Sequence, residues 1–138
     1  MAGKMEWAVV RCMDGRINPH VNDSVLKYGI PVEHDLISLS GGCGELINPD
    51  SRPSTDLSNV SLTLHGTERV LMIQHTDCGA YGGRAACGGT EEADRMFHLN
   101  EIQNSMLAVH QRHPALKITA ILIHILDNGA ATIEEVTL

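Results

Sequence analysis

Residues 70–78 read Val-Leu-Met-Ile-Gln-His-Thr-Asp-Cys, an apolar run that ends in side chains able to bind a metal. An unbroken apolar run of this length is typical of a parallel strand that is covered on both faces. We therefore predict a strand over residues 70–73 that carries His75 and Cys78 at its carboxyl end. Open α/β sheets hold their functional sites at that edge.

The rest of the chain alternates short apolar runs with helical patterns, which predicts an α/β fold. Besides residues 70–73, strands are predicted over residues 7–10, 35–39, 118–126 and 131–136. The sequence Asp-Asn-Gly at 127–129 is a strong hairpin signal, so the last strand should be antiparallel. We expect a single domain, residues 1–138, with a central, mostly parallel sheet of four strands, flanking helices and a C-terminal antiparallel edge strand.

Three stretches have the spacing of helices, namely residues 19–28, about 54–66 and 91–111. In the second stretch, Leu57, Val60 and Leu64 fall on one face, with Ser61 as a further candidate. We expect residues 41–44 to form a flexible turn and residues 48–55 to form a loop. The third stretch shows helical spacing in Met96, Leu99, Ile102, Met106, Leu107 and His110.

Composition and charge exclude several classes of protein. The chain has 138 residues and a net charge of −7, and a surface of that sign repels phosphate backbones, so we expect no nucleic-acid partner. The longest apolar stretch, residues 118–126, contains His124 and is too short to span a bilayer, and the first residues hold no apolar targeting segment. We expect a cytoplasmic protein without a membrane partner, in which four cysteines indicate metal binding or catalysis before disulfides.

Two predicted strand ends together supply two thiols, one imidazole and one carboxylate, from Cys12, Cys78, His75 and Asp14. This set suits tetrahedral Zn²⁺, and the two-residue gap between His75 and Cys78 lets both side chains reach one ion from a tight turn. Two plainer interpretations stay open. Either the residues are unrelated and the cysteines are small core side chains, or the zinc is structural and Asp14 is its fourth permanent ligand.

The motifs at residues 12–16 and 75–79 resemble the two signature motifs of the β-carbonic anhydrases in order, separation and strand context. The resemblance implies that Cys12, His75 and Cys78 bind Zn²⁺. It also implies that Asp14 and Arg16 form a catalytic pair. In the active form Arg16 holds Asp14 away from the metal and a water is the fourth ligand, whereas in an inactive form Asp14 displaces that water.

The resemblance further implies an activity. A carbonic anhydrase (carbonate dehydratase, a zinc lyase) catalyses the reversible hydration of carbon dioxide to bicarbonate and a proton by a zinc-bound hydroxide. The partner is then a small-molecule substrate, and because the family builds its pocket at a subunit interface, we expect a homodimer or a higher homo-oligomer. Two alternatives are kept: a carbon disulfide or carbonyl sulfide hydrolase on the same zinc site, and a non-catalytic, zinc-holding regulatory module.

Three features depart from the family pattern. Residues 38–42 replace a segment that commonly reads Arg-Asn-Ala-Gly, and Gln74 stands where a glycine is usual. The chain begins almost directly at the first predicted strand, without the family's N-terminal helical arm. These departures bear on the substrate pocket and the dimer more than on the metal.

Cys43 and Cys87 lie in glycine-rich stretches, which predicts that both are partly exposed. The plainer interpretation makes each of them a small residue in a tight turn. The alternatives are redox control of access to the site or a second metal site.

Overall fold

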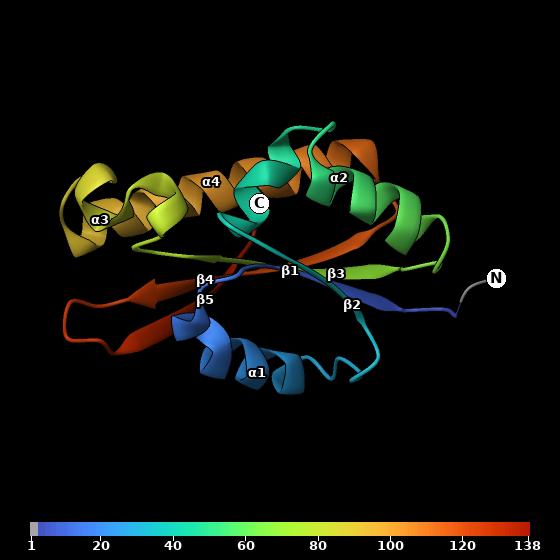
Figure 1. The fold of residues 1–138 in the computed structure, drawn as a ribbon, viewed down its shortest axis with the longest axis horizontal. Coiled ribbons are helices and arrows are strands. Elements are labelled where there is room, and N and C mark those ends of the chain that lie inside the picture. Colours follow the sequence, from blue (N-terminus) through green and yellow to red (C-terminus); the bar gives the residue numbers. More distant parts are fainter. Residues whose placement is uncertain (1–2) are drawn as a thin grey trace.

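The computed structural model describes residues 3–138 and contains a five-stranded sheet in the order β2-β1-β3-β4-β5 (Figure 1). The strand β5 (Ala131–Val136) runs antiparallel to its neighbour at one edge of the sheet. The predicted α/β fold class is confirmed, including the C-terminal antiparallel strand. The four parallel strands are β1 (Trp7–Cys12), β2 (Asp35–Leu39), β3 (Arg69–His75) and β4 (Lys117–Ile125).

Helices cover both faces of the sheet (Figure 1). α1 (Asn18–Lys27) lies on one face, with a proline in its first turn. The opposite face carries α4 (Glu91–Arg112) and α2 (Arg52–Asp56), which continues into the π-helix η3 (Leu57–Leu62). None of the helices described over residues 3–138 has both the length and the apolar character needed to cross a membrane. Short helical turns complete the chain: η1 (Gly15–Ile17), η2 (Gly42–Ile47), η4 (Gly79–Tyr81) and α3 (Gly83–Ala86).

Two apolar layers pack against the two faces of the sheet. Successive residues of a strand point to opposite faces, so Val10 and Met72 join the layer under α4, while Val9 and Ile73 join the layer under α1. All four side chains are fully buried. This double coverage is the reason why β3 is apolar at consecutive positions rather than at alternate ones.

The second helical region differs from the prediction at its start and on its buried face. Ser51 caps α2 with its side chain, so this helix begins inside the stretch that was expected to be a loop. Leu57 is buried, but Val60 and Leu64 are exposed, and Ser61 is buried in their place. The predicted face was therefore correct at Leu57 and Ser61 but wrong at Val60 and Leu64, because this segment is wound as a π-helix, whose wider turn moves side chains off the 3.6-residue spacing.

The helix α4 has the predicted extent, but its buried face is partly polar. Ile102 and Met106 are buried, whereas Met96 and Leu107 are about half exposed, at 50% and 45%. The apolar pattern therefore indicated the buried face only in part, because three polar side chains occupy inward positions. The buried residues of α4 are Asp94, His98, Ile102, Ser105, Met106 and Val109.

Cys43 and Cys87 are both buried, so the expectation of partial exposure was wrong. Residues 41–44 do not form a flexible turn, because η2 begins at Gly42 and packs against α4, β1 and β3. The Cys43 sulfur lies 3.3 Å from the carbonyl oxygen of Ile73. Burial raises the pKa of the Cys43 thiol to about 12, which makes this residue an unreactive part of the core.

Candidate metal centre

Cys12 is the last residue of β1, and its position depends on Gly42. The backbone of Gly42 passes close to the Cys12 amide in a left-handed conformation, with φ 55°. A Cβ atom at residue 42 would lie 2.8 Å from the Cys12 nitrogen, closer than such atoms approach in proteins. Glycine at this position therefore allows η2 to pack onto the end of β1.

His75 is the last residue of β3 and is almost fully buried. Its Nδ1 lies 2.7 Å from the carbonyl oxygen of Thr76, which can only accept a hydrogen bond, so Nδ1 carries the ring proton. Nε2 then bears a free lone pair, and it has no hydrogen-bond partner among residues 3–138. A buried nitrogen without a partner is costly, and this tautomer is the one that a zinc-binding histidine requires.

A tight turn after β3 brings Cys78 back toward Cys12. Asp77 has a φ of 53°, in the left-handed region that aspartate tolerates better than most residues. The Oγ1 atom of Thr76 accepts a hydrogen bond from the backbone N–H of Ile125 at 2.7 Å, which ties the turn to the end of β4. The turn is thus held by its backbone conformation and by a buried hydrogen bond.

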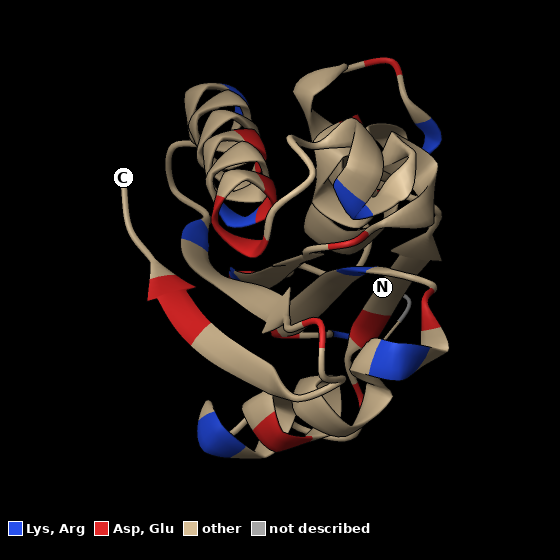
Figure 2. Cartoon of the chain, turned by 90° about the vertical axis from the view of Figure 1, so that its left-hand side faces the viewer, with Lys and Arg blue, Asp and Glu red and all other residues tan. Residues whose placement is uncertain are grey.

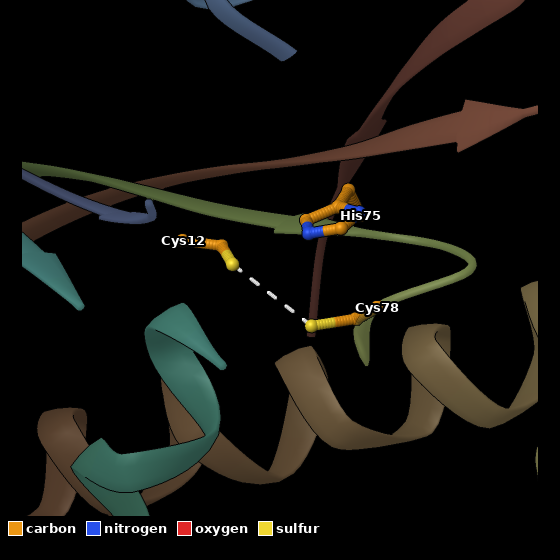
Figure 3. Close-up of side chains that lie close together, drawn as sticks. All are labelled: Cys12, His75 and Cys78. Carbon is orange, nitrogen blue, oxygen red and sulfur yellow. Dashed lines mark hydrogen bonds between the residues drawn. The ribbon is translucent and has the colours of Figure 1, made fainter. Parts of the chain in front are cut away.

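The side chains of Cys12, His75 and Cys78 meet at this edge of the sheet (Figure 3). The two sulfurs lie 3.9 Å apart, and the three candidate ligand atoms all lie within 4.8 Å of one another. Two thiolates at about 2.3 Å from a tetrahedral zinc would be about 3.8 Å apart, so the donor set fits this ion. Without a metal, the hydrogen bond between the thiols lowers the pKa of Cys12 and raises the pKa of Cys78, because the pair shares a proton.

Asp14 lies beside these donors and is held by Arg16. The Arg16 guanidinium donates from Nε to both carboxylate oxygens and from Nη2 to Oδ2 at 2.7 Å, which is a bidentate clamp. These hydrogen bonds lower the pKa of the Asp14 carboxyl to about 2. On its other side Arg16 reaches Asp77, with Nη1 3.0 Å from a carboxylate oxygen and Nη2 2.9 Å from the backbone carbonyl oxygen.

Charges of both signs gather at the carboxyl ends of the parallel strands, the edge that Figure 2 faces. Arg16 is flanked there by Asp14 and Asp77, whose hydrogen bonds raise the pKa of its guanidinium. Because these side chains are partly exposed, the ion pairs add little to the stability of the fold. Their main effect is to fix the direction of the Asp14 carboxylate.

The family of the chain follows from its sequence match. Residues 2–136 match a family model described as "Putative carbonic anhydrase". The chain belongs to this carbonic anhydrase family. A relative from Rickettsia bellii, an uncharacterized protein, is 22% identical over an alignment of 121 residues, and the match covers 83% of this chain and 74% of the relative.

Solved structures of β-carbonic anhydrases share the fold. The match to isoform I of Trichomonas vaginalis has 19% identity and a TM-score of 0.57, and it covers 96% of this chain and 84% of that chain. The match to CafA of Aspergillus fumigatus has 14% identity and a TM-score of 0.62, and it covers 97% and 76% of the two chains. Together with the family match, this likeness of fold confirms the predicted resemblance to the β-carbonic anhydrases.

In this carbonic anhydrase family member, all five predicted site residues come to one edge of the sheet. The sequence reasoning missed Asp77, which holds the far side of Arg16, although Asp77 lies inside the second motif. It also missed the role of Gly42, which only the close approach to Cys12 reveals. The residues brought together are Cys12, Asp14, Arg16, His75 and Cys78.

Proposed function

We propose that this family member catalyses the reversible hydration of carbon dioxide to bicarbonate and a proton, with a zinc ion held by Cys12, His75 and Cys78. The observation that carries the proposal is the free lone pair of His75 Nε2, which lies in one buried cluster with two sulfur atoms. Three protein donors, rather than four, leave a coordination position for water, as catalytic zinc sites do. Membership of the carbonic anhydrase family supports the same activity.

The metal would supply Lewis acidity, which lowers the pKa of a water molecule from about 15.7 to about 7. The residues of the chain are prepared for such an ion. The Thr76 carbonyl oxygen holds the proton of His75 on Nδ1, which keeps Nε2 free to bind. Cys12 and Cys78 would lose the proton that they share when the metal binds, because only thiolates are good ligands.

Asp14 would orient the reacting water. Because the pKa of its carboxyl is about 2, Asp14 is ionised at neutral pH and can only accept a hydrogen bond. A water that donates one hydrogen to Asp14 turns a lone pair toward the carbon of carbon dioxide. Arg16 fixes the carboxylate for this task, and the proton that is released on hydration passes to solvent.

The proposal is tested by a stopped-flow pH-indicator assay on protein whose zinc content has been measured. We expect carbon dioxide hydration that exceeds the buffer rate and rises in proportion to the zinc bound at the cluster of Cys12, His75 and Cys78. Zinc-loaded protein that hydrates no carbon dioxide would overturn the proposal, and it would leave the zinc-holding module if the protein also turned over no sulfur analogue. The same preparation is offered carbonyl sulfide and carbon disulfide, since hydrogen sulfide release without carbon dioxide hydration would identify the hydrolase.

A further inference from the structure

The inward face of α4 carries two titratable residues, Asp94 and His98, one helical turn apart, and neither has any exposed surface. Cys87, in the segment that leads to α4, is buried beside them at 4% exposure. Burying a carboxylate and an imidazole on a helix face costs free energy unless each polar atom finds a partner. This second cluster is separate from the donors at the end of β3 and requires its own explanation.

The polar atoms of this cluster converge on one ring nitrogen. His98 Nε2 lies 3.4 Å from Asp94 Oδ1 and 3.9 Å from the Cys87 sulfur, and one atom from each residue lies within 4.8 Å of the others. A catalytic relay of Cys, His and Asp uses opposite ring nitrogens for its two neighbours, so this geometry does not suit nucleophilic catalysis. Three donor atoms that lie this close to one another are instead arranged as metal ligands are.

Only one of the two carboxylate oxygens of Asp94 is hydrogen-bonded within residues 3–138. Oδ2 accepts hydrogen bonds from the backbone N–H of Asp77 at 2.9 Å and from Arg84 Nε at 3.0 Å. Oδ1 has no hydrogen-bond partner in the described part of the chain, although the side chain is fully buried. Because Oδ1 faces His98 Nε2, the orphaned oxygen points into the cluster.

We propose that Cys87, Asp94 and His98 bind a second divalent metal ion of borderline softness, such as Zn²⁺. One sulfur, one nitrogen and one oxygen donor suit borderline ions such as Zn²⁺ and Co²⁺. Around a tetrahedral zinc, ligand nitrogen and oxygen lie about 3.3 Å apart, and nitrogen and sulfur about 3.6 Å apart. The cluster has 3.4 and 3.9 Å for these two separations, so small shifts would close it around an ion.

The charges and protonation states around the second cluster are compatible with a bound cation. Arg84 offsets the charge of Asp94 through Oδ2 and leaves Oδ1 free. Burial lowers the pKa of His98 to about 4, so its ring is neutral, and Nε2 can act as a ligand when the ring proton is on Nδ1. Burial also raises the pKa of the Cys87 thiol, so as the sulfur–metal bond forms, one proton leaves the thiol for solvent.

Gln74 contacts the other nitrogen of the His98 ring. Its Nε2 lies 3.0 Å from His98 Nδ1, and its Oε1 has no hydrogen-bond partner among residues 3–138. A metal on His98 Nε2 places the ring proton on Nδ1, which then needs an acceptor. A half-turn of the Gln74 amide exchanges its two atoms and lets Oε1 accept that proton. Because Gln74 precedes His75, it also links the two clusters.

A cation in the second cluster would fasten the segment between Cys78 and Cys87 to α4. This segment contains η4 and α3, and its glycines at 82 and 83 have positive φ values, as do the glycines at 88 and 89 directly after Cys87. Glycine backbone loses much conformational entropy when it becomes ordered. The second ion would therefore stabilise the connection that follows Cys78.

Metal stoichiometry tests this proposal independently of catalytic activity. Each protein is saturated with zinc, desalted and analysed for zinc and sulfur by mass spectrometry. We expect two zinc ions per chain in the wild type and one in each of the variants Cys78→Ser and Cys87→Ser. The matched control Cys43→Ser, a buried cysteine outside both clusters, should keep two. A wild type with one zinc, lost in Cys78→Ser and kept in Cys87→Ser, would overturn the second site and leave the first intact.

The absorption spectrum of bound Co²⁺ tests the second cluster while its three residues stay unchanged. In a variant with both Cys12→Ser and Cys78→Ser, Co²⁺ should give a thiolate-to-cobalt charge-transfer band and the visible bands of tetrahedral cobalt. Adding His98→Gln, with folding checked by circular dichroism, should remove both signals. A double variant that is folded and shows no thiolate–cobalt band at saturating Co²⁺ would refute the proposal.

Discussion

Asp14 Oδ2 lies 3.9 Å from His75 Nε2, next to the candidate ligand atoms but beyond hydrogen-bonding distance. The separation persists because Arg16 occupies both carboxylate oxygens of Asp14 and is itself anchored on Asp77. Asp14 is therefore placed to contact a small molecule at the donor cluster without being one of the three donors.

Replacing Cys78 by serine should remove the metal at the first cluster and reduce carbon dioxide hydration to the buffer rate. A neutral hydroxyl is a far weaker zinc ligand than a thiolate, and the two remaining donors would not retain the ion. Zinc analysis and stopped-flow assay of the same sample provide the measurement. Full activity in Cys78→Ser would mean that the metal is bound elsewhere.

Replacing Asp14 by alanine should keep the zinc and lower the hydration rate by roughly 100-fold, the loss typical of removing a group that handles a proton or orients a water. The measurement is the rate per bound zinc. Asp14→Asn is the matched control for size and should lose nearly as much, because the amide cannot replace a carboxylate acceptor clamped by Arg16. If Asp14→Ala instead sheds its zinc, Asp14 is a structural ligand and the proposed role is wrong.

Replacing Arg16 by lysine should lower the rate by about 10-fold while the zinc content stays the same. Lysine keeps the positive charge but loses the planar fork that fixes Asp14, and small displacements of a positioning group are costly. The comparison is Arg52→Lys, which alters an exposed arginine paired with Asp56 and should not change the rate. Equal rates for Arg16→Lys and the wild type would show that charge alone is sufficient.

Replacing Gly42 by alanine should destabilise the fold and weaken metal binding. The new Cβ would meet the Cys12 nitrogen at 2.8 Å, and the φ of 55° is unfavourable for alanine. Gly29→Ala isolates the second effect, since Gly29 has φ 65° and no atom within 4 Å of the built Cβ. We expect Gly42→Ala to lose roughly 1–3 kcal/mol more than Gly29→Ala in denaturant unfolding, from the clash with backbone. Equal losses would show that the close approach to Cys12 is easily relaxed.

We also expect a homodimer or a higher homo-oligomer. The strand β2 lies at the edge of the sheet, and its Leu36 is 57% exposed. An edge strand of this kind is a ready template for pairing with another chain. Light scattering at micromolar concentration should give at least twice the 15.0 kDa mass of the chain, and Leu36→Lys should shift it downward. The control is Leu26→Lys, at an exposed position of α1 rather than of the edge strand β2, and it should leave the mass unchanged. A wild type that is strictly monomeric would contradict the expectation.

Much of the fold was predictable because local sequence patterns carry its signal. The apolar residues 70–73 indicated a strand covered on both faces, and the structure has β3 in the middle of the sheet. The turn at residues 127–129 indicated the antiparallel β5, which was confirmed. The local patterns were less informative where polar side chains face inward, as Asp94 and His98 do on α4. Hydrophobic periodicity cannot indicate that a buried polar residue has found partners.

By itself, the sequence determined the α/β class, the positions of the parallel strands and the two motifs at the ends of β1 and β3, although β1 and β3 are longer than predicted and include Cys12 and His75. These features depend on neighbouring residues, through alternation, turns and helical spacing. Only the tertiary structure decided that β1 pairs with β3, which brings Cys12 within 3.9 Å of Cys78, and that Asp77 anchors Arg16. It also decided that Cys87, Asp94 and His98 meet in a second buried cluster. The reason is that strand order and the pairing of buried polar groups are set by contacts between residues far apart in the chain, which no local pattern encodes.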